Sequence, residues 1–251
     1  MGKRASRRNA KRVSDHYTNY EADNVRPLFE ESRWSPVENE KRDQKYRKNI
    51  RPQNENQQAF MDAVDTTPLV FAAGAAGTGK TYVAIAKAVE ALEAGKVRRI
   101  VLSRPAVEAG ESLGYLPGDM EEKLSPYLRP LYDALCDRLS SKRLKALTAE
   151  GVIEIAPIAF MRGRTLNNAF VVIDEAQNCT YGQLKMLLTR LGWNSTMVVT
   201  GDPAQSDLLT GMSGLDDVCR KLEGLSSVEI IRFEKSDVVR HPLVAELIDS
   251  L

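Results

Sequence analysis

The feature that most constrains the fold is a glycine-rich stretch between an apolar segment and a helix-like segment. The sequence GAAGTGKT occupies residues 74–81 and fits the pattern G-x-x-x-x-G-K-[ST]. It follows the apolar run LVFAA at residues 69–73 and precedes a helical pattern from Lys80 to about Ala94. A strand that turns into a helix through such a loop is the context that this motif requires. The chain is therefore expected to contain a phosphate-binding loop.

The residues of this loop have distinct expected roles around a bound nucleotide. Glycine allows the backbone to curl, so that successive N–H groups and the start of the following helix face the phosphates. Lys80 is expected to reach the β and γ phosphates, and the Thr81 hydroxyl is expected to bind Mg²⁺. The expected nucleotide-binding residues of the loop are Gly74, Ala75, Ala76, Gly77, Thr78, Gly79, Lys80 and Thr81.

Short apolar segments alternate with helix-like segments along most of the chain. Order is expected to begin near Asn54, with a short amphipathic helix that carries Phe60, Met61 and Val64 on one face and ends before Pro68. This alternation predicts an α/β fold with a mainly parallel sheet covered by helices on both faces. Strands are expected at residues 69–73, 98–102, 152–156, 170–174, 196–200 and 228–233, and further helices at 80–94, 121–149 and 180–191.

Charge divides the chain into two parts of opposite sign. Residues 1–50 contain 13 Lys and Arg against 8 Asp and Glu, whereas residues 51–251 contain 22 against 26. The polar, basic segment has little periodicity, which predicts a poorly ordered N-terminal arm over residues 1–50 and one domain over residues 51–251. The arm could contact nucleic-acid phosphates or simply be solvated. Bulk charge alone does not support nucleic-acid binding.

Cysteine spacing and hydropathy indicate a protein of a reducing compartment. Cys136, Cys179 and Cys219 are far apart and form no C-x-x-C pair, and the chain has only two histidines, so a zinc site is not expected. No stretch approaches the roughly 18 apolar residues needed to cross a bilayer, and no apolar segment follows the basic N-terminal residues. We therefore expect a cytoplasmic protein without membrane attachment.

Acidic and polar side chains follow two of the expected strands. Asp174 and Glu175 end the segment FVVIDEAQ, at the carboxyl end of a buried strand, where open parallel sheets place their ligands. Asp174 would hold Mg²⁺ through water, and Glu175 would orient and deprotonate the attacking water; the alternative is an ordinary acidic helix start. Thr200, Asp202 and Gln205, in TGDPAQSD, would reach the same edge and either sense the γ-phosphate or only form a turn.

Two observations bear on the nucleotide and on the reaction. The stretch EKSD at residues 234–237 stands where guanine-binding proteins have N-K-x-D, but Glu234 cannot supply the donor and acceptor pair of an amide. ATP is therefore expected rather than GTP. A small-molecule kinase would usually lack a water-positioning glutamate directly after the metal-binding aspartate, so Glu175 favours hydrolysis.

Long ordered stretches of the sequence carry a resemblance to a known family. They are GAAGTGKTYVAIAKAVEAL, RRIVLSRPAVEAGESLGYLPGDMEEKLSPYLRPLYDAL, IEIAPIAFMRGRTLNNAFVVIDEAQNCT, KMLLTRLG, VVTGDPAQSDL and DVVRHPLV. From about Asn54 to the C-terminus the chain resembles the PhoH family, relatives of superfamily 1 helicases with a single RecA-like ATPase domain. The family has proline where Ala75 stands and usually an apolar residue near Ser206, but neither departure removes a catalytic group. The resemblance implies a RecA-like P-loop ATPase domain over residues 51–251.

The resemblance also implies roles for residues outside the loop. Gln57 resembles the adenine-reading glutamine of the helicase Q motif, although it could be simply a polar helix residue. Arg104 resembles a residue that lines the single-strand track, although arginine at such a position is more often a surface charge. Arg162 and Arg164 could grip backbone phosphates or pair with local acids. Arg240 is the candidate for neutralising charge at the γ-phosphate. The expected catalytic residues are Lys80, Asp174, Glu175, Gln205 and Arg240.

A single RecA-like domain supplies only half of a two-sided ATP site, so the resemblance implies a homo-oligomer, expected to be a hexameric ring. The leading hypothesis is an ATPase that moves along or remodels single-stranded RNA or DNA, with RNA preferred. Aromatic residues make up only 6% of the chain and follow no RNA-recognition pattern, so contacts should follow the backbone. The alternative is an ATP-gated interaction protein without coupled work. A built-in nuclease would need another carboxylate cluster, for which neither terminal part has room. The compact architecture would suit a bacterial or phage protein.

Overall fold

The structure is a computed structural model that describes residues 50–105, 120–209 and 211–239, with only the backbone described over residues 120–126. The chain divides into two units between Arg42 and Asp43, and all of the described residues belong to the second unit. The expected basic arm, residues 1–50, therefore lies almost entirely outside the described residues.

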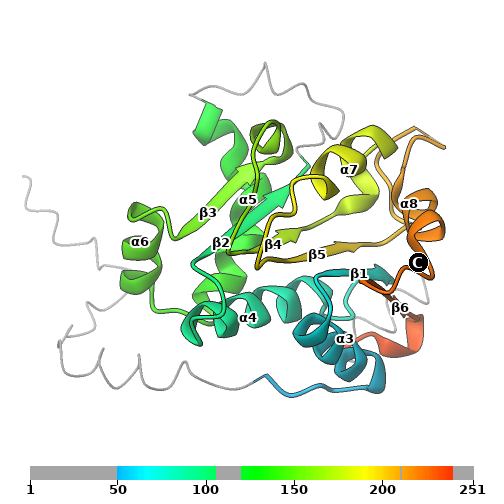
Figure 1. Ribbon diagram of the computed structural model, residues 1–251, viewed down its shortest axis with the longest axis horizontal. Coiled ribbons are helices and arrows are strands. Elements are labelled where there is room, and N and C mark those ends of the chain that lie inside the picture. The colour runs from blue at the N-terminus through cyan, green and yellow to red at the C-terminus, as the bar shows by residue number, and fades with distance from the viewer. Residues whose placement is uncertain (1–49, 106–119, 210, 240–251) are drawn as a thin grey trace, which may run out of the picture. The chain divides into compact units, whose positions relative to one another are not determined.

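A parallel sheet forms the centre of this second unit (Figure 1). Its strand order is β3-β2-β4-β5-β1-β6, and every pairing between neighbours is parallel. All carboxyl ends therefore meet at one edge of the sheet, with β1 between β5 and β6. The strands are β1 (Leu69–Gly74), β2 (Arg99–Arg104), β3 (Ile153–Pro157), β4 (Ala169–Ile173), β5 (Thr196–Gly201) and β6 (Val228–Phe233).

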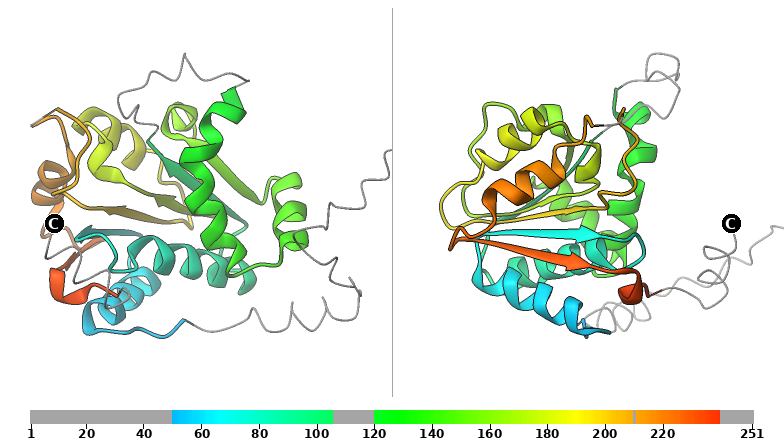
Figure 2. Two further views of the ribbon diagram at one scale, coloured as in Figure 1. Left: turned by 180° about the vertical axis from the view of Figure 1, so that it is seen from behind. Right: turned by 90° about the vertical axis from the view of Figure 1, so that its right-hand side faces the viewer.

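Helices cover both faces of the sheet, as the right-hand view of Figure 2 shows. One face packs against α3, α4, α5 and α6, and the other against α7 and α8. The bounds are α3 (Glu55–Thr66), α4 (Lys80–Glu93), α5 (Met120–Cys136), α6 (Ser141–Ala149), α7 (Tyr181–Leu188) and α8 (Leu215–Leu222), with single turns η2 (Ile158–Met161), η3 (Ala176–Asn178) and η4 (Lys235–Asp237). The expected α/β fold of the RecA-like type, with helices on both faces, is confirmed.

Alternating side chains of each strand divide the apolar core into two layers. Phe170 and Val172 of β4 face the α4 side, whereas Val171 and Ile173 face the α7 side. Such strands are apolar on both faces because each face is covered. On the α4 side, Phe60 of α3 is fully buried and meets the ring of Phe233 edge to face, with the centroids 6.0 Å apart. This contact fixes α3 against β6.

Local sequence signals explain where several helices begin and end. Asn54 caps α3, because its side chain accepts a hydrogen bond from the Gln57 backbone N–H, and Pro68 follows the last turn. Thr180 and Gln183 form a reciprocal capping box at the start of α7. The helical region expected over residues 121–149 is two helices, because the chain breaks after Cys136 and Ser140 caps α6.

Helix α8 (Leu215–Leu222) is not among the helices expected from the sequence. Leu215, Val218 and Cys219 are buried on one side of this short helix, and the i, i+3, i+4 spacing of these residues was the available signal. Within the described part of the chain, no helix has both the length and the apolar character that a membrane span requires.

Candidate nucleotide site

The glycine-rich loop leaves β1 at the carboxyl edge of the sheet and enters α4. Gly74 has a φ of 138°, and a Cβ placed on it would lie 2.0 Å from the carbonyl oxygen of Phe233 in β6. Only glycine fits this close approach of two backbones. Lys80 begins α4, and its Nζ donates to the carbonyl oxygens of Gly74 and Ala75, each at 2.7 Å, and to Thr78 Oγ1 at 3.3 Å. The loop therefore curls around the Lys80 ammonium group, which is bound to three of its oxygen atoms.

Gln57 supports the same loop from α3. Its side chain is buried, and its Nε2 donates to the carbonyl oxygen of Thr78 at 2.9 Å. Its Oε1 accepts from the backbone N–H of Gln53, also at 2.9 Å. The amide considered for adenine recognition thus lies beside the loop, with its oxygen and one N–H bound to the chain itself.

The segment after β6 returns to the loop as well. The backbone N–H of Val239 donates to the carbonyl oxygen of Gly77 at 2.9 Å. The buried carboxylate of Asp237 accepts a hydrogen bond from Asn56 Nδ2 at 2.7 Å. The backbone carbonyl oxygen of Asp237 accepts one from Asn54 Nδ2 at 3.1 Å. Asp237, the last residue of the stretch compared with a guanine-binding turn, therefore joins α3 to η4.

Asp174, directly after β4, accepts hydrogen bonds from two hydroxyl groups. Thr81 Oγ1 and Thr200 Oγ1 each donate to Asp174 Oδ1 at 2.6 Å. Asp174 and Thr200 are both buried, and the backbone N–H of Asp174 donates to the carbonyl oxygen of Ser103 in β2. Strands β4 and β5 and helix α4 thus bring together an all-oxygen group of the kind that Mg²⁺ prefers.

Glu175 lies beside this group in an unusual backbone conformation. Its φ of 54° and ψ of 41° are left-handed, which is uncommon for a residue with a side chain. Glu175 Oε1 pairs with Arg104 Nη2 at 3.2 Å, and Oε2 accepts from Gln177 Nε2. Arg104 Nη1 is also 3.8 Å from Asp174 Oδ2. The arginine expected to line a nucleic-acid track therefore points at both carboxylates.

Gln177 links the ends of β4 and β5, a role that was not expected from the sequence. Its buried side chain accepts at Oε1 from the backbone N–H of Asp202 at 3.0 Å. The Asp202 carboxylate in turn accepts from the backbone N–H of Ala76 in the loop and from that of Ala204, both at 3.0 Å. The segment DEAQ carried this signal only as a polar residue two positions after the glutamate.

A cavity of about 320 Å³ is lined by most of the residues expected to bind or hydrolyse the nucleotide, but not by the arginines considered for nucleic-acid contact. The exposed Gln205 is part of its wall, so the structure brings it to the same space as the loop and both carboxylates. The lining residues are Ala76, Gly77, Gly79, Lys80, Thr81, Tyr82, Asp174, Glu175, Gly201, Asp202 and Gln205.

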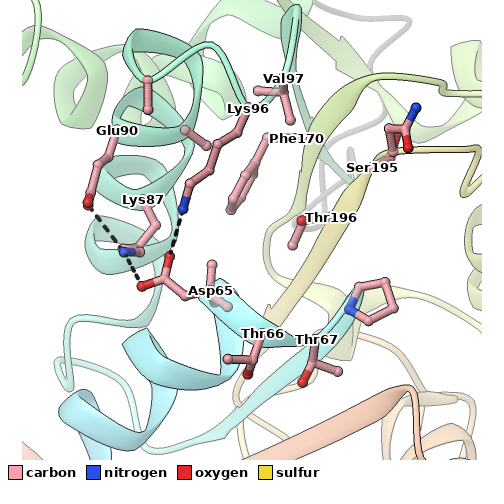
Figure 3. A pocket seen from close by; sticks show the side chains of 15 residues that line it. Asp65, Thr66, Thr67, Lys87, Glu90, Lys96, Val97, Phe170, Ser195 and Thr196 are labelled. Carbon is pink, nitrogen blue, oxygen red and sulfur yellow. Dashed lines mark hydrogen bonds and ion pairs between the residues drawn. The ribbon is translucent and has the colours of Figure 1, made fainter.

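A second cavity, of about 330 Å³, lies at the opposite edge of the sheet, before β1 and β5 (Figure 3). In its wall the buried Lys87 binds Asp65 at 2.7 Å and Glu90 at 3.2 Å. Burial would lower the pKa of Lys87, but the hydrogen bonds and charges of these two carboxylates hold it above its ordinary value. The two cavities are alike in volume, so chemistry rather than size distinguishes them. Of these two, the first is lined by the glycine-rich loop.

The arginines considered for nucleic-acid contact lie in different surroundings. Arg162 is exposed after η2. Arg164 forms a two-pronged pair with Glu154 of β3, at 2.5 and 2.7 Å, which is the local pairing weighed as the alternative. This pairing raises the pKa of Arg164, and it lowers the pKa of Glu154 against the opposing effect of burial. Arg240 lies outside the described residues.

A G-x-x-x-x-G-K-T loop joins a strand to a helix at the carboxyl edge of a parallel sheet, and an aspartate directly follows a nearby strand. These features define the class of P-loop NTPases. Within this class the chain belongs to the family described as PhoH-like protein, whose model matches residues 49–251. The resemblance found in the sequence is thereby confirmed.

Curated relatives carry this name or a closely similar one. A PhoH-like protein of Mycobacterium tuberculosis is 55% identical over 204 residues, which cover 81% of this chain and 58% of the relative. One of Bacillus subtilis is 53% identical, with 81% and 64% covered, and Protein PhoH of Escherichia coli K12 is 49% identical, with 77% and 56% covered. The chain thus spans less than two thirds of the length of these relatives.

Similarity to solved structures is more distant. The large terminase of a thermophilic bacteriophage gives a TM-score of 0.48 at 12% identity, covering 79% of this chain and 50% of the terminase. Pif1 helicase of Candida albicans gives a TM-score of 0.41 at 12% identity, covering 80% and 43%.

Proposed function

We propose that this protein is a Mg²⁺-dependent ATPase that uses hydrolysis to move along or remodel single-stranded RNA or DNA. The observation that carries the proposal is the convergence of the Thr81 and Thr200 hydroxyl groups on one oxygen of the buried Asp174, beside the glycine-rich loop. A buried carboxylate held by two hydroxyl groups next to a phosphate loop suits a cation that bridges protein and phosphate oxygens.

Phosphate binding is assigned to the loop and to the start of α4. The Lys80 ammonium now donates to the loop carbonyls of Gly74 and Ala75, and phosphate oxygens would replace these acceptors. Backbone N–H groups at the start of α4 and the dipole of this helix add to the attraction. Gln57 would read adenine with the amide N–H that does not hold Thr78.

Mg²⁺ would be held by Thr81 and Asp174 on the protein side. In the part of the chain that the structure describes, no cluster of three or more His, Cys, Asp or Glu side chains is placed to hold a metal ion alone. The remaining ligands would therefore be water and phosphate oxygens, which is usual for Mg²⁺. When bound, the ion would neutralise charge on the β and γ phosphates.

Glu175 is assigned the role of orienting and deprotonating the attacking water, because it is the carboxylate next to Asp174 and lines the same cavity. Gln205, from the wall of that cavity, would contact the γ-phosphate, and Arg240 would neutralise charge that develops there. A homo-oligomeric ring, for which we propose six subunits, would close the open side of the site. A cytoplasmic location fits this activity.

Nucleic-acid contact is assigned to the polymer backbone rather than to bases. Arg162 is exposed and suited to phosphate, whereas Arg164 would have to exchange Glu154 for a phosphate group. Contacts of this kind weaken as salt concentration rises, because the polymer releases condensed counterions.

The first test measures ATP hydrolysis by the purified protein with and without single-stranded RNA and DNA. We expect Lys80→Ala to lose both nucleotide affinity and hydrolysis. Glu175→Gln should still bind nucleotide, with a rate lower by about 10²-fold or more. Lys96→Ala serves as the control, because Lys96 is an exposed lysine at the second cavity.

A rate in wild-type protein that never exceeds that of Lys80→Ala would refute the ATPase proposal. Oligomer size, measured by light scattering with and without ATP, then addresses the second candidate function, an ATP-gated interaction protein. Assembly that depends on ATP in the absence of hydrolysis would favour this second candidate.

A further inference from the structure

Each carboxylate oxygen of Glu175 has one side-chain partner in this structure. Oε1 pairs with Arg104 Nη2 at 3.2 Å, and Oε2 accepts a hydrogen bond from Gln177 Nε2. A glutamate that activates water must direct an oxygen at that water, within about 3 Å. Because Oε1 is paired with the Arg104 guanidinium group, its remaining lone pair can face water only in the orientation that this ion pair allows. The structure therefore shows Glu175 in a held position.

The two partners hold Glu175 with unequal firmness. Gln177 is buried and anchored, because its Oε1 accepts from the backbone N–H of Asp202, whose carboxylate binds the loop at Ala76. The ion pair with Arg104 is more open, with 22% of the Arg104 side chain and 36% of the Glu175 side chain exposed to solvent. Ion pairs with this degree of exposure are weak and are broken easily by a competing ligand. Release should therefore occur at Oε1 while Gln177 keeps Oε2.

Arg104 is also suited to a different partner. It is the last residue of β2, at the carboxyl edge of the sheet, and it lies between the two carboxylates, with Nη1 3.8 Å from Asp174 Oδ2. A guanidinium group binds phosphate in the same forked geometry as carboxylate. A phosphodiester that approached this edge would compete directly with Glu175 for Arg104.

We propose that Arg104 is a positioning residue that restrains Glu175 until a phosphodiester of single-stranded nucleic acid binds Arg104 and releases it. This inference rests on the proposed ATPase function and adds the step by which the polymer accelerates hydrolysis. In the restrained state ATP binds but water is poorly oriented. In the released state the Glu175 side chain keeps its hydrogen bond to Gln177 and rotates so that Oε1 reaches the water.

A purely structural role for Arg104 makes the opposite prediction. If its guanidinium only neutralised Asp174 and Glu175, its removal would leave two uncompensated carboxylates beside each other, and hydrolysis would fall or stay unchanged. The sign of the rate change without polymer therefore separates the two roles.

The test compares wild-type protein with Arg104→Gln and Arg104→Lys by steady-state ATP hydrolysis, with and without an oligo(U) RNA or oligo(dT) DNA of about 30 nucleotides, longer than the span of a single-strand binding site. Arg143→Gln is the matched control, because it removes another partly exposed ion pair, with Glu93 at 3.4 Å, away from the nucleotide cavity. Binding of a fluorescent ATP analogue and of labelled oligonucleotide is measured in parallel.

We expect Arg104→Gln to raise kcat without polymer about two- to fivefold, the range that a partly exposed ion pair can contribute, with KM for ATP unchanged. Addition of polymer should accelerate this variant little further. Arg104→Lys, which keeps the positive charge, should restore the low rate without polymer and most of the acceleration. Arg143→Gln should match wild-type protein in every measurement.

Three outcomes would overturn the inference. If Arg104→Gln loses polymer acceleration without a higher rate in its absence, Arg104 is a polymer contact and not a restraint, and the proposed function stands. If the variant is faster but wild-type protein responds to no polymer, the polymer is not the trigger, and the nucleic-acid part of the proposed function fails too. If neither protein hydrolyses ATP, the ATPase proposal and the inference fall together.

Discussion

Gly74 occupies a position where two backbones approach too closely for any side chain. The positive φ of this residue and the nearness of the Phe233 carbonyl are separate obstacles, because the first is a conformational cost and the second is a steric one. Gly95, just after α4, has a φ of 69° but nothing within 4 Å of a Cβ placed on it. The two glycines therefore allow a position with both obstacles to be compared with one that has a positive φ but open space.

We expect Gly74→Ala to lower the free energy of unfolding by about 3 kcal/mol or more, because strain and overpacking each cost about 1–3 kcal/mol. Gly95→Ala, with the conformational cost alone, should lose about 1 kcal/mol. Urea unfolding followed by circular dichroism measures both losses. Equal losses in the two variants would contradict the close approach of β1 and β6.

The sequence could indicate site residues that belong to a local motif, but not contacts between residues from distant elements. The loop, Thr81 and Asp174 were predictable because each is defined by its own strand or helix and by a local motif. The pairing of Glu175 with Arg104 and the partners of Asp237 were not, because these partners come from other elements. Asn56 and Asp237 are 181 residues apart, and no periodicity within either segment indicates that they meet.

At the scale of elements, the pair between Glu154 and Arg164 ties β3 to the loop that precedes β4. Its hydrogen bond to Arg164 lowers the pKa of the Glu154 carboxyl group, so the folded state binds this proton less readily than the unfolded state. The stabilisation is therefore present above the unfolded pKa of about 4.3 and is lost as pH falls through the lower folded value.

We expect Glu154→Gln to lower the free energy of unfolding by about 1 kcal/mol at about pH 7, a value that allows for partial solvent exposure of the pair. The difference from wild-type protein should shrink below about pH 4, as the Glu154 carboxyl group takes up its proton. Urea unfolding between about pH 7 and pH 3.5 tests this dependence. Glu93→Gln, which removes the partner of Arg143, is the control, and a difference that does not vary with pH would argue against the pair.

The positions of the strands along the chain could be predicted from the sequence, but the order of the strands in the sheet could not. Each expected strand is present within a residue or two, because apolar runs bounded by polar turns are strong local signals. The order β3-β2-β4-β5-β1-β6 depends on crossovers that local patterns do not encode. The short α8 was missed because eight residues give little more than two turns of periodicity.

At the scale of the whole described unit, the cysteines report on the integrity of both core layers. Burial raises the pKa of the Cys179 thiol to about 12 and that of the Cys219 thiol to about 11, and both side chains lie on the α7 side of the sheet. Cys136, at the end of α5 on the other side, is only partly buried, although burial and the nearby Asp133 and Asp137 also raise its pKa.

Alkylation should therefore distinguish these thiols, because the thiolate is the reactive form. In native protein at about pH 8, close to the ordinary thiol pKa, we expect iodoacetamide to modify Cys136 slowly and to leave Cys179 and Cys219 unmodified. All three should react in urea. Mass spectrometry of proteolytic peptides measures the extent at each site, and rapid modification of Cys179 in native protein would contradict the packing of α7 against the sheet.

The hydrogen bonds that join Gln57 to Thr78 and Val239 to Gly77 attach two distant stretches of chain to one loop. Asp237 adds a direct connection between those stretches through Asn54 and Asn56. A shift of the loop on nucleotide binding would therefore act on both stretches at once. We expect nucleotide binding to change the strength of the contact between α3 and η4 as well.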